Sequence, residues 1–329
     1  MTGSPTFGLL CSRASSRLRG GLAPSTTQRY LSKLRLFVAF TIFLQKNLLN
    51  IDVWLILGFL EFLVYNKKSF PTVANTLSAI KTQCQLYGLD CIAFSDKRIS
   101  LFIKSLKINR PFRASLKPII SLQMLTDICR VCDSMYQGFI FKAVYLTAFF
   151  SFLRISNLVP HSLASYCHLK QLARADVMFA HPGATLLISW SKTLQTKDKI
   201  RLIKIPFLQD SPLCPVSALQ VLLKSLPGTK NSPLFQILNK SQWVPLTESR
   251  VRKHFSPVLQ VLDLQNSNYT FHSFRRSGAT LAFNQNVSLQ NIKAHGTWTS
   301  DSVWSYISQD ANVSSEVALS FQQALSTTS

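Results

Sequence analysis

Two long apolar runs constrain most strongly how this chain can fold. Residues 53–65 are interrupted only by Glu61, and residues 143–153 lie between Lys142 and Arg154. A helix that crosses a bilayer needs about 20 apolar residues, so neither run is long enough to span one. Both runs are therefore predicted to be helices buried in a protein core, and we expect no contact with a membrane.

The first part of the chain has the pattern of a small all-helical domain. Residues 1–24 are rich in Ser, Arg and Gly and lack acidic residues, which predicts a disordered basic arm. Capping residues then precede an amphipathic pattern that starts near Tyr30. Further helices are predicted over residues 51–65, 73–87 and 97–108. We expect residues 25–108 to fold as one helical domain.

A second domain, residues 119–329, is predicted to mix helices with a small sheet. Residues 109–118 precede it and read NRPFRASLKP, a segment typical of an exposed linker. Short β-type runs follow a pair of helices, and two of these runs flank a polar loop, which indicates a hairpin. Helices are predicted at 121–135, 139–152, 215–226, 248–262, 273–284, 289–295 and 300–307, and strands at 177–179, 185–190 and 200–206. The predicted fold class is therefore mainly α with a small β-sheet, of the α+β type.

The charge of the chain indicates a polyanionic partner. The sequence has 36 Lys and Arg residues against 14 Asp and Glu residues, a formal net charge of +22. A globular chain this basic repels itself unless an anion such as nucleic acid is nearby. A merely basic protein of the ribosomal kind is the alternative. The cations expected to contact DNA from the first domain and the linker are Arg29, Lys33, Arg35, Lys81, Lys104, Arg110 and Arg113.

The cysteines do not predict a disulfide framework or a metal site. There are seven of them, scattered along the chain. Cys129 and Cys132 have the CxxC spacing of a zinc ligand pair, but a structural zinc needs four ligands and no second pair follows. Cys167 with His168 is a distant alternative pair. We therefore expect no bound metal.

Several polar and aromatic residues of the second domain stand out against this background. Arg154 ends an apolar run, where a cation needs a counter-charge. His272 and Arg275 have the i, i+3 spacing that places side chains on one face of a helix. Lys192 lies in the predicted hairpin loop. Three of them have an ordinary structural explanation, namely an internal ion pair for Arg154, a structural role for His272 and a solvated turn for Lys192.

The aromatic residues near the end of the domain complete this series. Trp298, Trp304 and Tyr306 follow Gly296 within a short stretch, and each could be an ordinary core residue. Their order after the arginine, the lysine and the His-x-x-Arg pair is more specific than any one of them. The stretches that carry it read FLRISNLVP, WSKTLQ, HSFRRSGAT and GTWTSDSVWSYI.

This order resembles the tyrosine recombinase (phage integrase) family over nearly the whole chain. In detail it is most similar to the recombinases of Crypton-like and DIRS-like mobile elements. The resemblance implies a helical core-binding domain at residues 25–108 and a catalytic domain at 119–329. It also implies the catalytic residues, which would be Arg154, Lys192, His272, Arg275, Trp298 and Tyr306.

Two positions depart from the family pattern. The family carries His or Trp directly after the glycine, whereas here Thr297 holds that place, Trp298 follows and His295 precedes Gly296. We favour Trp298, whose indole N–H can donate to a phosphate oxygen. Many members also have an acidic residue shortly after the first arginine, where this chain has Asn157.

The resemblance implies cleavage and rejoining of double-stranded DNA through a 3′-phosphotyrosine, without metal, ATP or another cofactor. Arg276 would be either a further phosphate contact or a structural residue. Family members act as tetramers on paired DNA sites, and the amphipathic tail at residues 313–325 could serve such assembly. The alternatives are a domesticated DNA-binding protein that no longer cuts and a type IB topoisomerase. A mobile-element enzyme of a eukaryote would be expected in the nucleus.

Overall fold

The computed structural model describes residues 7–109, 118–190, 200–298 and 300–307. The chain divides into two compact units, Met1–Ala114 and Ser115–Ser329, so the boundary lies within the linker predicted at 109–118. The described residues do not include Lys192, Arg110, Arg113 or the tail at 313–325. Each unit is described by itself.

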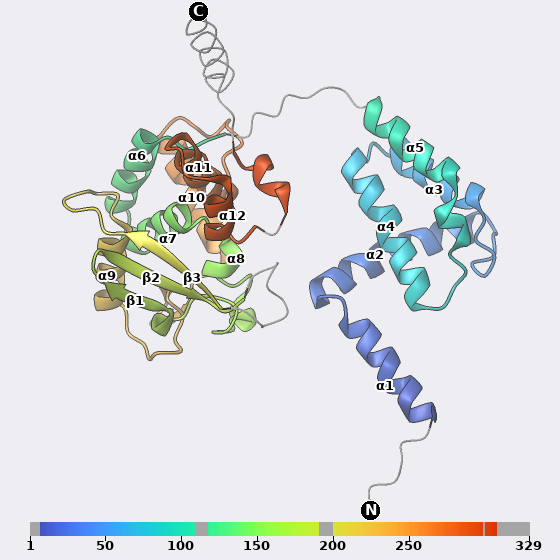
Figure 1. Cartoon of the computed structure of the whole chain (residues 1–329), viewed down its shortest axis with the longest axis horizontal. Coiled ribbons are helices and arrows are strands. Elements are labelled where there is room, and N and C mark those ends of the chain that lie inside the picture. Colours follow the sequence, from blue (N-terminus) through green and yellow to red (C-terminus); the bar gives the residue numbers. More distant parts are fainter. Residues whose placement is uncertain (1–6, 110–117, 191–199, 299, 308–329) are drawn as a thin grey trace, which may run out of the picture. The chain divides into compact units, whose positions relative to one another are not determined.

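The first unit is entirely helical in its described part (Figure 1). Its centre is the apolar helix α3, which begins after Asp52, whose side chain accepts a hydrogen bond from the backbone N–H of Leu55. The inner face of α3 packs against Phe37 and residues of the neighbouring helices. The helices are α1 (Phe7–Gly20), α2 (Pro24–Phe43), α3 (Val53–Tyr65), α4 (Phe70–Leu86) and α5 (Lys97–Ile108).

The expectation of disorder before residue 25 is wrong for residues 7–20, which form α1. The segment has few breakers between its first residue and Gly20, and its arginines and leucines are good helix formers. Its lack of acidic residues indicated a basic arm, but charge composition alone does not exclude a helix.

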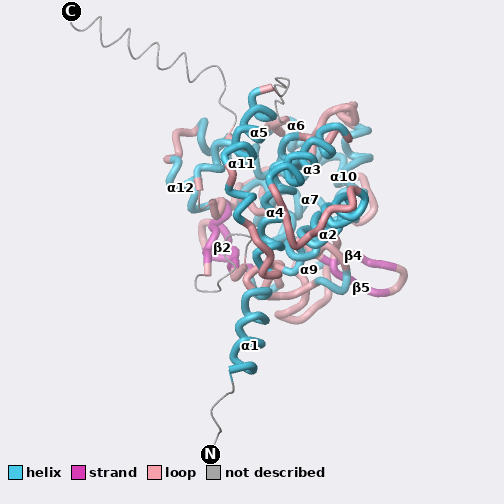
Figure 2. Tube along the Cα trace, turned by 90° about the vertical axis from the view of Figure 1, so that its right-hand side faces the viewer, coloured by secondary structure: helices cyan, strands magenta, loops and turns pink. Residues whose placement is uncertain are grey.

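The second unit contains the sheet and the remaining helices. Strands β1 (Val177–Ala180), β2 (Gly183–Ile188) and β3 (Arg201–Pro206) form an antiparallel sheet in that order. Figure 2 shows a separate hairpin of β4 (Gln236–Asn239) and β5 (Gln242–Pro245). The helices are α6 (Leu122–Asp133), α7 (Gly138–Ser151), α8 (Ile155–Leu158), α9 (Pro215–Ser225), α10 (Glu248–Val261), α11 (Phe271–Asn284) and α12 (Leu289–His295).

Helix α7 is the core of this unit, as its apolar sequence predicts. Nearly all its side chains are buried, and α6, α9, α11 and β3 pack around it. The sheet contributes one face, because Leu186 pairs with Ile203 and both point into the core while Leu202 and Lys204 remain exposed. This alternation is the two-residue period of a half-buried strand.

Helices α7 and α11 approach each other closely at Gly278. A Cβ placed at this position would come 2.0 Å from the carbonyl oxygen of Phe149 and 2.7 Å from the ring of Phe152. Only glycine permits this distance, so the two helices are held together at the level where the candidate site lies.

Three local expectations differ from the structure. Helix α11 begins at Phe271, two residues earlier than predicted, so His272 is within its first turn. Residues 300–307 contain only a short 3₁₀ turn, Asp301–Ser305. The β4–β5 hairpin was not predicted, because its strands are only four residues long and a single turn joins them. The other predicted helices start and end within a few residues of their expected positions, and the short helix α8 had not been predicted.

No helix in the described part of the chain is long and apolar enough to cross a membrane.

The described residues also contain no cluster of three or more His, Cys, Asp or Glu side chains that could hold a metal ion. Cys129 and Cys132 are fully buried free thiols on α6, and burial raises the pKa of Cys129 to about 12.

Candidate active site

The site is assembled where α7 ends and α8 begins. Phe152 terminates α7 in the left-handed conformation, with a φ of 52°. Leu153 is buried, and Arg154 then becomes the N-cap residue of the short helix α8. This turn leaves the Arg154 side chain half-buried at the edge of the core instead of continuing the helix.

The first turns of α11 supply the next cations. Thr270 caps this helix through a reciprocal bond pattern with Ser273. Arg275 is 1% exposed, and its guanidinium donates to the carbonyl oxygens of Phe152 and Gly296, the latter at 2.7 Å. Arg275 therefore ties α11 to the end of α7 and to the end of α12.

Two aromatic rings cover Arg275. Its Cζ lies 3.9 Å from the centre of the Trp298 ring and 5.3 Å from the centre of the Tyr306 ring. The Trp298 and Tyr306 rings meet edge to face at 5.2 Å, and the His272 ring lies 6.3 Å from that of Tyr306. Such cation–π contacts stabilise a guanidinium that has lost its water.

The backbone around Tyr306 is attached to α11. Thr280 donates to the carbonyl oxygen of Tyr306 at 3.3 Å, and Arg276 donates to that of Ser305 at 3.5 Å. The Arg276 Cζ lies 5.7 Å from the Tyr306 ring. Arg276, which was expected on DNA or in a structural pair, is 7% exposed and contacts the segment that carries Tyr306.

The electrostatics of this cluster favour an anion. Burial, and secondarily the charge of Arg154, lowers the pKa of Arg275 to about 9. The His272 side chain is exposed, but partial desolvation, followed by the charges of Arg275, Arg154, Arg276 and Arg252, lowers its pKa below the ordinary value. None of Arg154, Arg275 and Arg276 forms an ion pair with a described acidic residue. An added anion would relieve this concentration of positive charge.

Unpartnered hydrogen-bond donors in the cluster support the same conclusion. Arg154 Nη1, Arg275 Nε and Trp298 Nε1 are buried and have no acceptor among the described residues. Buried donors are nearly always paired, so such groups need an explanation. A bound oxyanion would satisfy donors of this kind with charge-assisted hydrogen bonds.

The structure thus brings together five of the predicted catalytic residues, namely Arg154, His272, Arg275, Trp298 and Tyr306. Of the alternatives to Trp298, His295 donates from Nε2 to the carbonyl oxygen of Phe150 at 2.9 Å. Thr297 is buried, with a φ of 57° that turns the chain between α12 and Trp298.

Arg252 belongs near this site and was not predicted. It lies on α10 close enough to His272 to lower that residue's pKa, and its guanidinium donates to Glu248 at 2.5 and 3.2 Å. The i, i+4 spacing of Glu248 and Arg252 was visible in the sequence and indicates a helix-surface pair. Nothing in that spacing shows that the pair faces His272.

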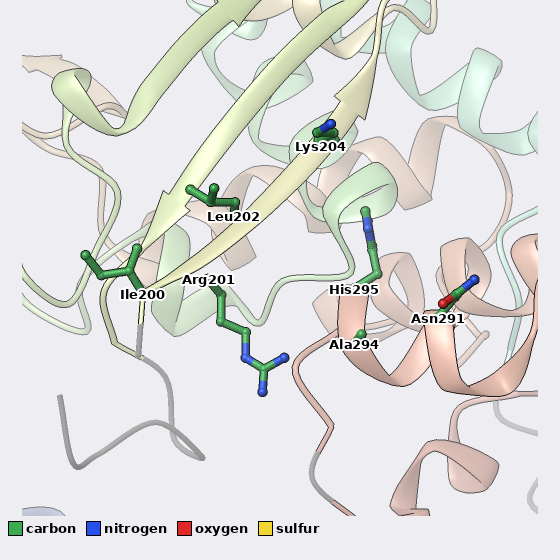
Figure 3. A pocket seen from close by; sticks show the side chains of 7 residues that line it. All are labelled: Ile200, Arg201, Leu202, Lys204, Asn291, Ala294 and His295. Carbon is green, nitrogen blue, oxygen red and sulfur yellow. The ribbon is translucent and has the colours of Figure 1, made fainter. Parts of the chain in front are cut away.

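A cleft of about 750 Å³ lies beside the cluster, between β3 and α12 (Figure 3). Arg201 and Lys204 line it from β3, and Asn291 and His295 line it from α12. The cleft therefore presents two cationic side chains of β3 opposite α12.

The cations predicted in the first unit differ in their surroundings. Arg29, Arg35 and Lys104 are exposed. Lys33 donates to Thr76 at 2.7 Å, and burial with the nearby charge of Arg29 lowers its pKa. Lys81 donates to Ser95 at 3.2 Å. Arg29, Arg35 and Lys104 are thus more exposed than Lys33 and Lys81, although the Arg29 Nε donates to the carbonyl oxygen of Ser25 at 3.2 Å.

No protein-family model matches the chain, and no curated protein matches it by sequence. Solved structures do match it. The integrase of transposon Tn1549 in complex with transposon right-end DNA has a TM-score of 0.64 at 13% identity, covering 93% of this chain and 96% of that one. The XerH site-specific recombinase bound to palindromic difH DNA has a TM-score of 0.61 at 19% identity, covering 89% and 78%. This chain has the tyrosine recombinase fold.

A lambda integrase dimer bound to a core site shares the fold as well, with a TM-score of 0.54 at 16% identity, covering 93% of this chain and 78% of that one. The tyrosine recombinase fold thus extends over both units of this chain. The more detailed resemblance to Crypton-like and DIRS-like elements stays a prediction.

Proposed function

We propose that this protein is a site-specific DNA recombinase that cleaves and rejoins DNA through a 3′-phosphotyrosine. The observation that carries the proposal is the packing of Tyr306 against Arg275 and Trp298, inside a cluster of cations without described acidic partners. A tyrosine beside an anion-binding cluster is the arrangement that nucleophilic attack on a phosphodiester needs.

The chemistry follows from the groups present. The Tyr306 hydroxyl oxygen attacks the phosphorus, the bond from phosphorus to the 5′-oxygen breaks, and the 3′-phosphate remains on the tyrosine. The transition state gains negative charge on its non-bridging oxygens. Arg154, Arg275 and the indole N–H of Trp298 stabilise that charge, as the unpartnered donors suggest.

Proton transfer is assigned to two other residues. His272, whose lowered pKa keeps it largely neutral near pH 7, accepts the tyrosine proton. Lys192, by resemblance, protonates the leaving 5′-oxygen. Because the phosphotyrosine keeps the energy of the original bond, a 5′-hydroxyl of another strand can reverse the reaction without ATP.

Double-stranded DNA is the proposed substrate. The solved recombinases of this fold include several in complex with DNA. A phosphate backbone would be attracted by the net charge of +22. It could also be contacted by the exposed cations Arg29, Arg35 and Lys104, and by Arg201 and Lys204 in the cleft. We propose that four copies assemble on paired sites.

A DNA-binding protein that no longer cuts is the second candidate, and a type IB topoisomerase the third. The assembled Tyr306, Arg275 and His272 favour an enzyme over a binding protein, because binding alone does not require a tyrosine enclosed by buried cations. Relaxation of supercoils by a monomer, without paired sites, would favour the topoisomerase.

A suicide substrate tests the proposal. The protein is incubated with nicked duplexes from DNA that flanks its own gene and with a random-sequence pool, and covalent adducts are resolved on a denaturing gel. We expect an adduct with wild type and with Tyr136→Phe, an exposed tyrosine of the same unit, and none with Tyr306→Phe. An adduct with Tyr306→Phe would refute the nucleophile. Tight binding by wild type without any adduct would favour the binding protein.

A further inference from the structure

Asn157 connects two parts of the candidate active site. It lies on α8, is 2% exposed, and donates from Nδ2 to the carbonyl oxygen of Trp190 at 2.7 Å. Its own backbone N–H donates to the carbonyl oxygen of Arg154 at 2.9 Å. One residue therefore contacts both the arginine that caps α8 and the peptide that follows strand β2.

Asn157 is itself held firmly. Its carbonyl oxygen accepts from the backbone N–H of Leu172 at 2.9 Å, and the neighbouring Ser156 carbonyl accepts from Gln171 at 3.2 Å. With its backbone fixed on both sides, the side chain has little freedom to choose another partner. The bond to Trp190 is thus a defined tether and not an incidental surface contact.

The chemistry of this tether requires an amide. The partner is a carbonyl oxygen, which only accepts, so the side chain must donate. An ionised aspartate at this buried position would set two acceptors against each other and leave the Trp190 carbonyl unpaired, which is unfavourable. This explains why the chain carries Asn157 where the resemblance led us to expect an acidic residue.

We infer that Asn157 is a positioning residue that fixes the exit of strand β2 relative to Arg154. The inference rests on the proposed function, in which Lys192, two residues after Trp190 in the sequence, protonates the leaving 5′-oxygen. Residues 191–199 are outside the described part of the chain, so the inference concerns their anchor at Trp190 and not their own conformation.

The test separates proton donation from the rest of the reaction. Cleavage is measured with an ordinary DNA substrate and with one whose scissile 5′-bridging oxygen is replaced by sulfur. A thiolate leaves without a proton, so the sulfur substrate does not depend on the acid. For Asn157→Asp we expect a loss on the order of 10²-fold on the oxygen substrate, as for a small misplacement of a reacting group, and recovery to within a few-fold of wild type on the sulfur substrate.

Gln171→Glu is the matched control, because it makes the same amide-to-carboxylate change on the neighbouring amide, which does not bond to Trp190. Any cleavage that it loses should be lost equally on both substrates. If Asn157→Asp does not fold, as judged by circular dichroism, then Asn157→Ser tests the tether without a buried charge, and the same sulfur rescue is expected.

The inference would be overturned if Asn157→Asp cleaved the oxygen substrate at the wild-type rate. It would also be overturned if a folded variant lost cleavage equally on both substrates. Either result would leave the recombinase proposal intact. A wild-type protein that cleaves neither substrate would overturn the proposed function and the inference together.

Discussion

The guanidinium of Arg275 lies over the ring of Trp298, with its Cζ 3.9 Å from the centre of the indole ring. Arg275 is at the same time fixed by the carbonyl oxygens of Phe152 and Gly296. These contacts hold the cation in place but leave its Nε and the Trp298 Nε1 without a described acceptor. The site is thus preorganised, with donors that a transition state could use.

We therefore predict that Trp298→Phe slows DNA cleavage by about 10²-fold, since it removes one donor but keeps a ring against Arg275. The free energy of unfolding should also fall, because the smaller ring leaves part of the buried indole site empty, although no described hydrogen bond of the indole is lost. Single-turnover cleavage and chemical denaturation measure the two quantities. His295→Ala, which removes the bond to Phe150, should slow cleavage less; the reverse ranking would move the transition-state contact to His295.

Replacement of Arg252 should affect the electrostatics of His272. Because Arg252 is one of the cations that depress the His272 pKa, Arg252→Gln is expected to raise that pKa, which NMR titration of the imidazole can follow. Lys253→Gln, an exposed cation of the same helix, is the control and should leave the His272 pKa unchanged.

Gly278→Ala should be destabilising even though alanine favours helices. The new methyl group would meet the Phe149 carbonyl and the Phe152 ring, and such overpacking typically destabilises by about 1–3 kcal/mol. The matched control is Gly58→Ala on α3, where the nearest atom is 4.0 Å away and alanine should stabilise by about 0.5–1 kcal/mol. Thermal unfolding of the two variants compares the signs of their changes in stability. A stabilised Gly278→Ala would contradict the close approach of α7 and α11.

Stability should fall in mild acid because of His254. Its ring stacks on Phe141 at 3.6 Å and shares a 3.0 Å hydrogen bond with Tyr145, and burial lowers its pKa to about 4. The unfolded chain, in which histidine titrates near 6.5, then binds more protons than the native chain between these values. The histidine contribution to stability is therefore complete above about pH 6.5 and is lost as the pH falls toward 4, by about 1–2 kcal/mol because the ring is partly exposed to solvent.

Urea unfolding of wild type and His254→Phe across this pH range measures the effect. The variant keeps an aromatic ring against Phe141 but no longer titrates, so its stability should depend less on pH between 4 and 6.5. His181→Gln, an exposed histidine, should keep the wild-type slope. Equal slopes for wild type and His254→Phe would show that His254 is not the responsible group.

Much of the fold could be predicted because it depends on local pattern. The apolar runs at residues 53–65 and 143–153 are buried at the centres of the two cores, and the alternation in β3 marks its inner face. The predictions failed where the local signal is weak. The sequence of helix α1 does not reveal an apolar core that this helix could join. The strands of the β4–β5 hairpin are too short for a recognisable period.

The sequence by itself determined the order of the candidate catalytic residues and the elements that carry them, since helix and strand periods and the capping residues are local properties. Only the tertiary structure decided which side chains meet. The neighbours Arg275 and Arg276 should diverge on a helix, yet Tyr306 lies within reach of both, because the turn after α12 returns the chain across α11. Similarly, Thr297 in its left-handed turn places Trp298 on Arg275 and leaves His295 bonded to Phe150. Contacts between residues distant in the chain depend on how separate elements pack, which no local pattern records.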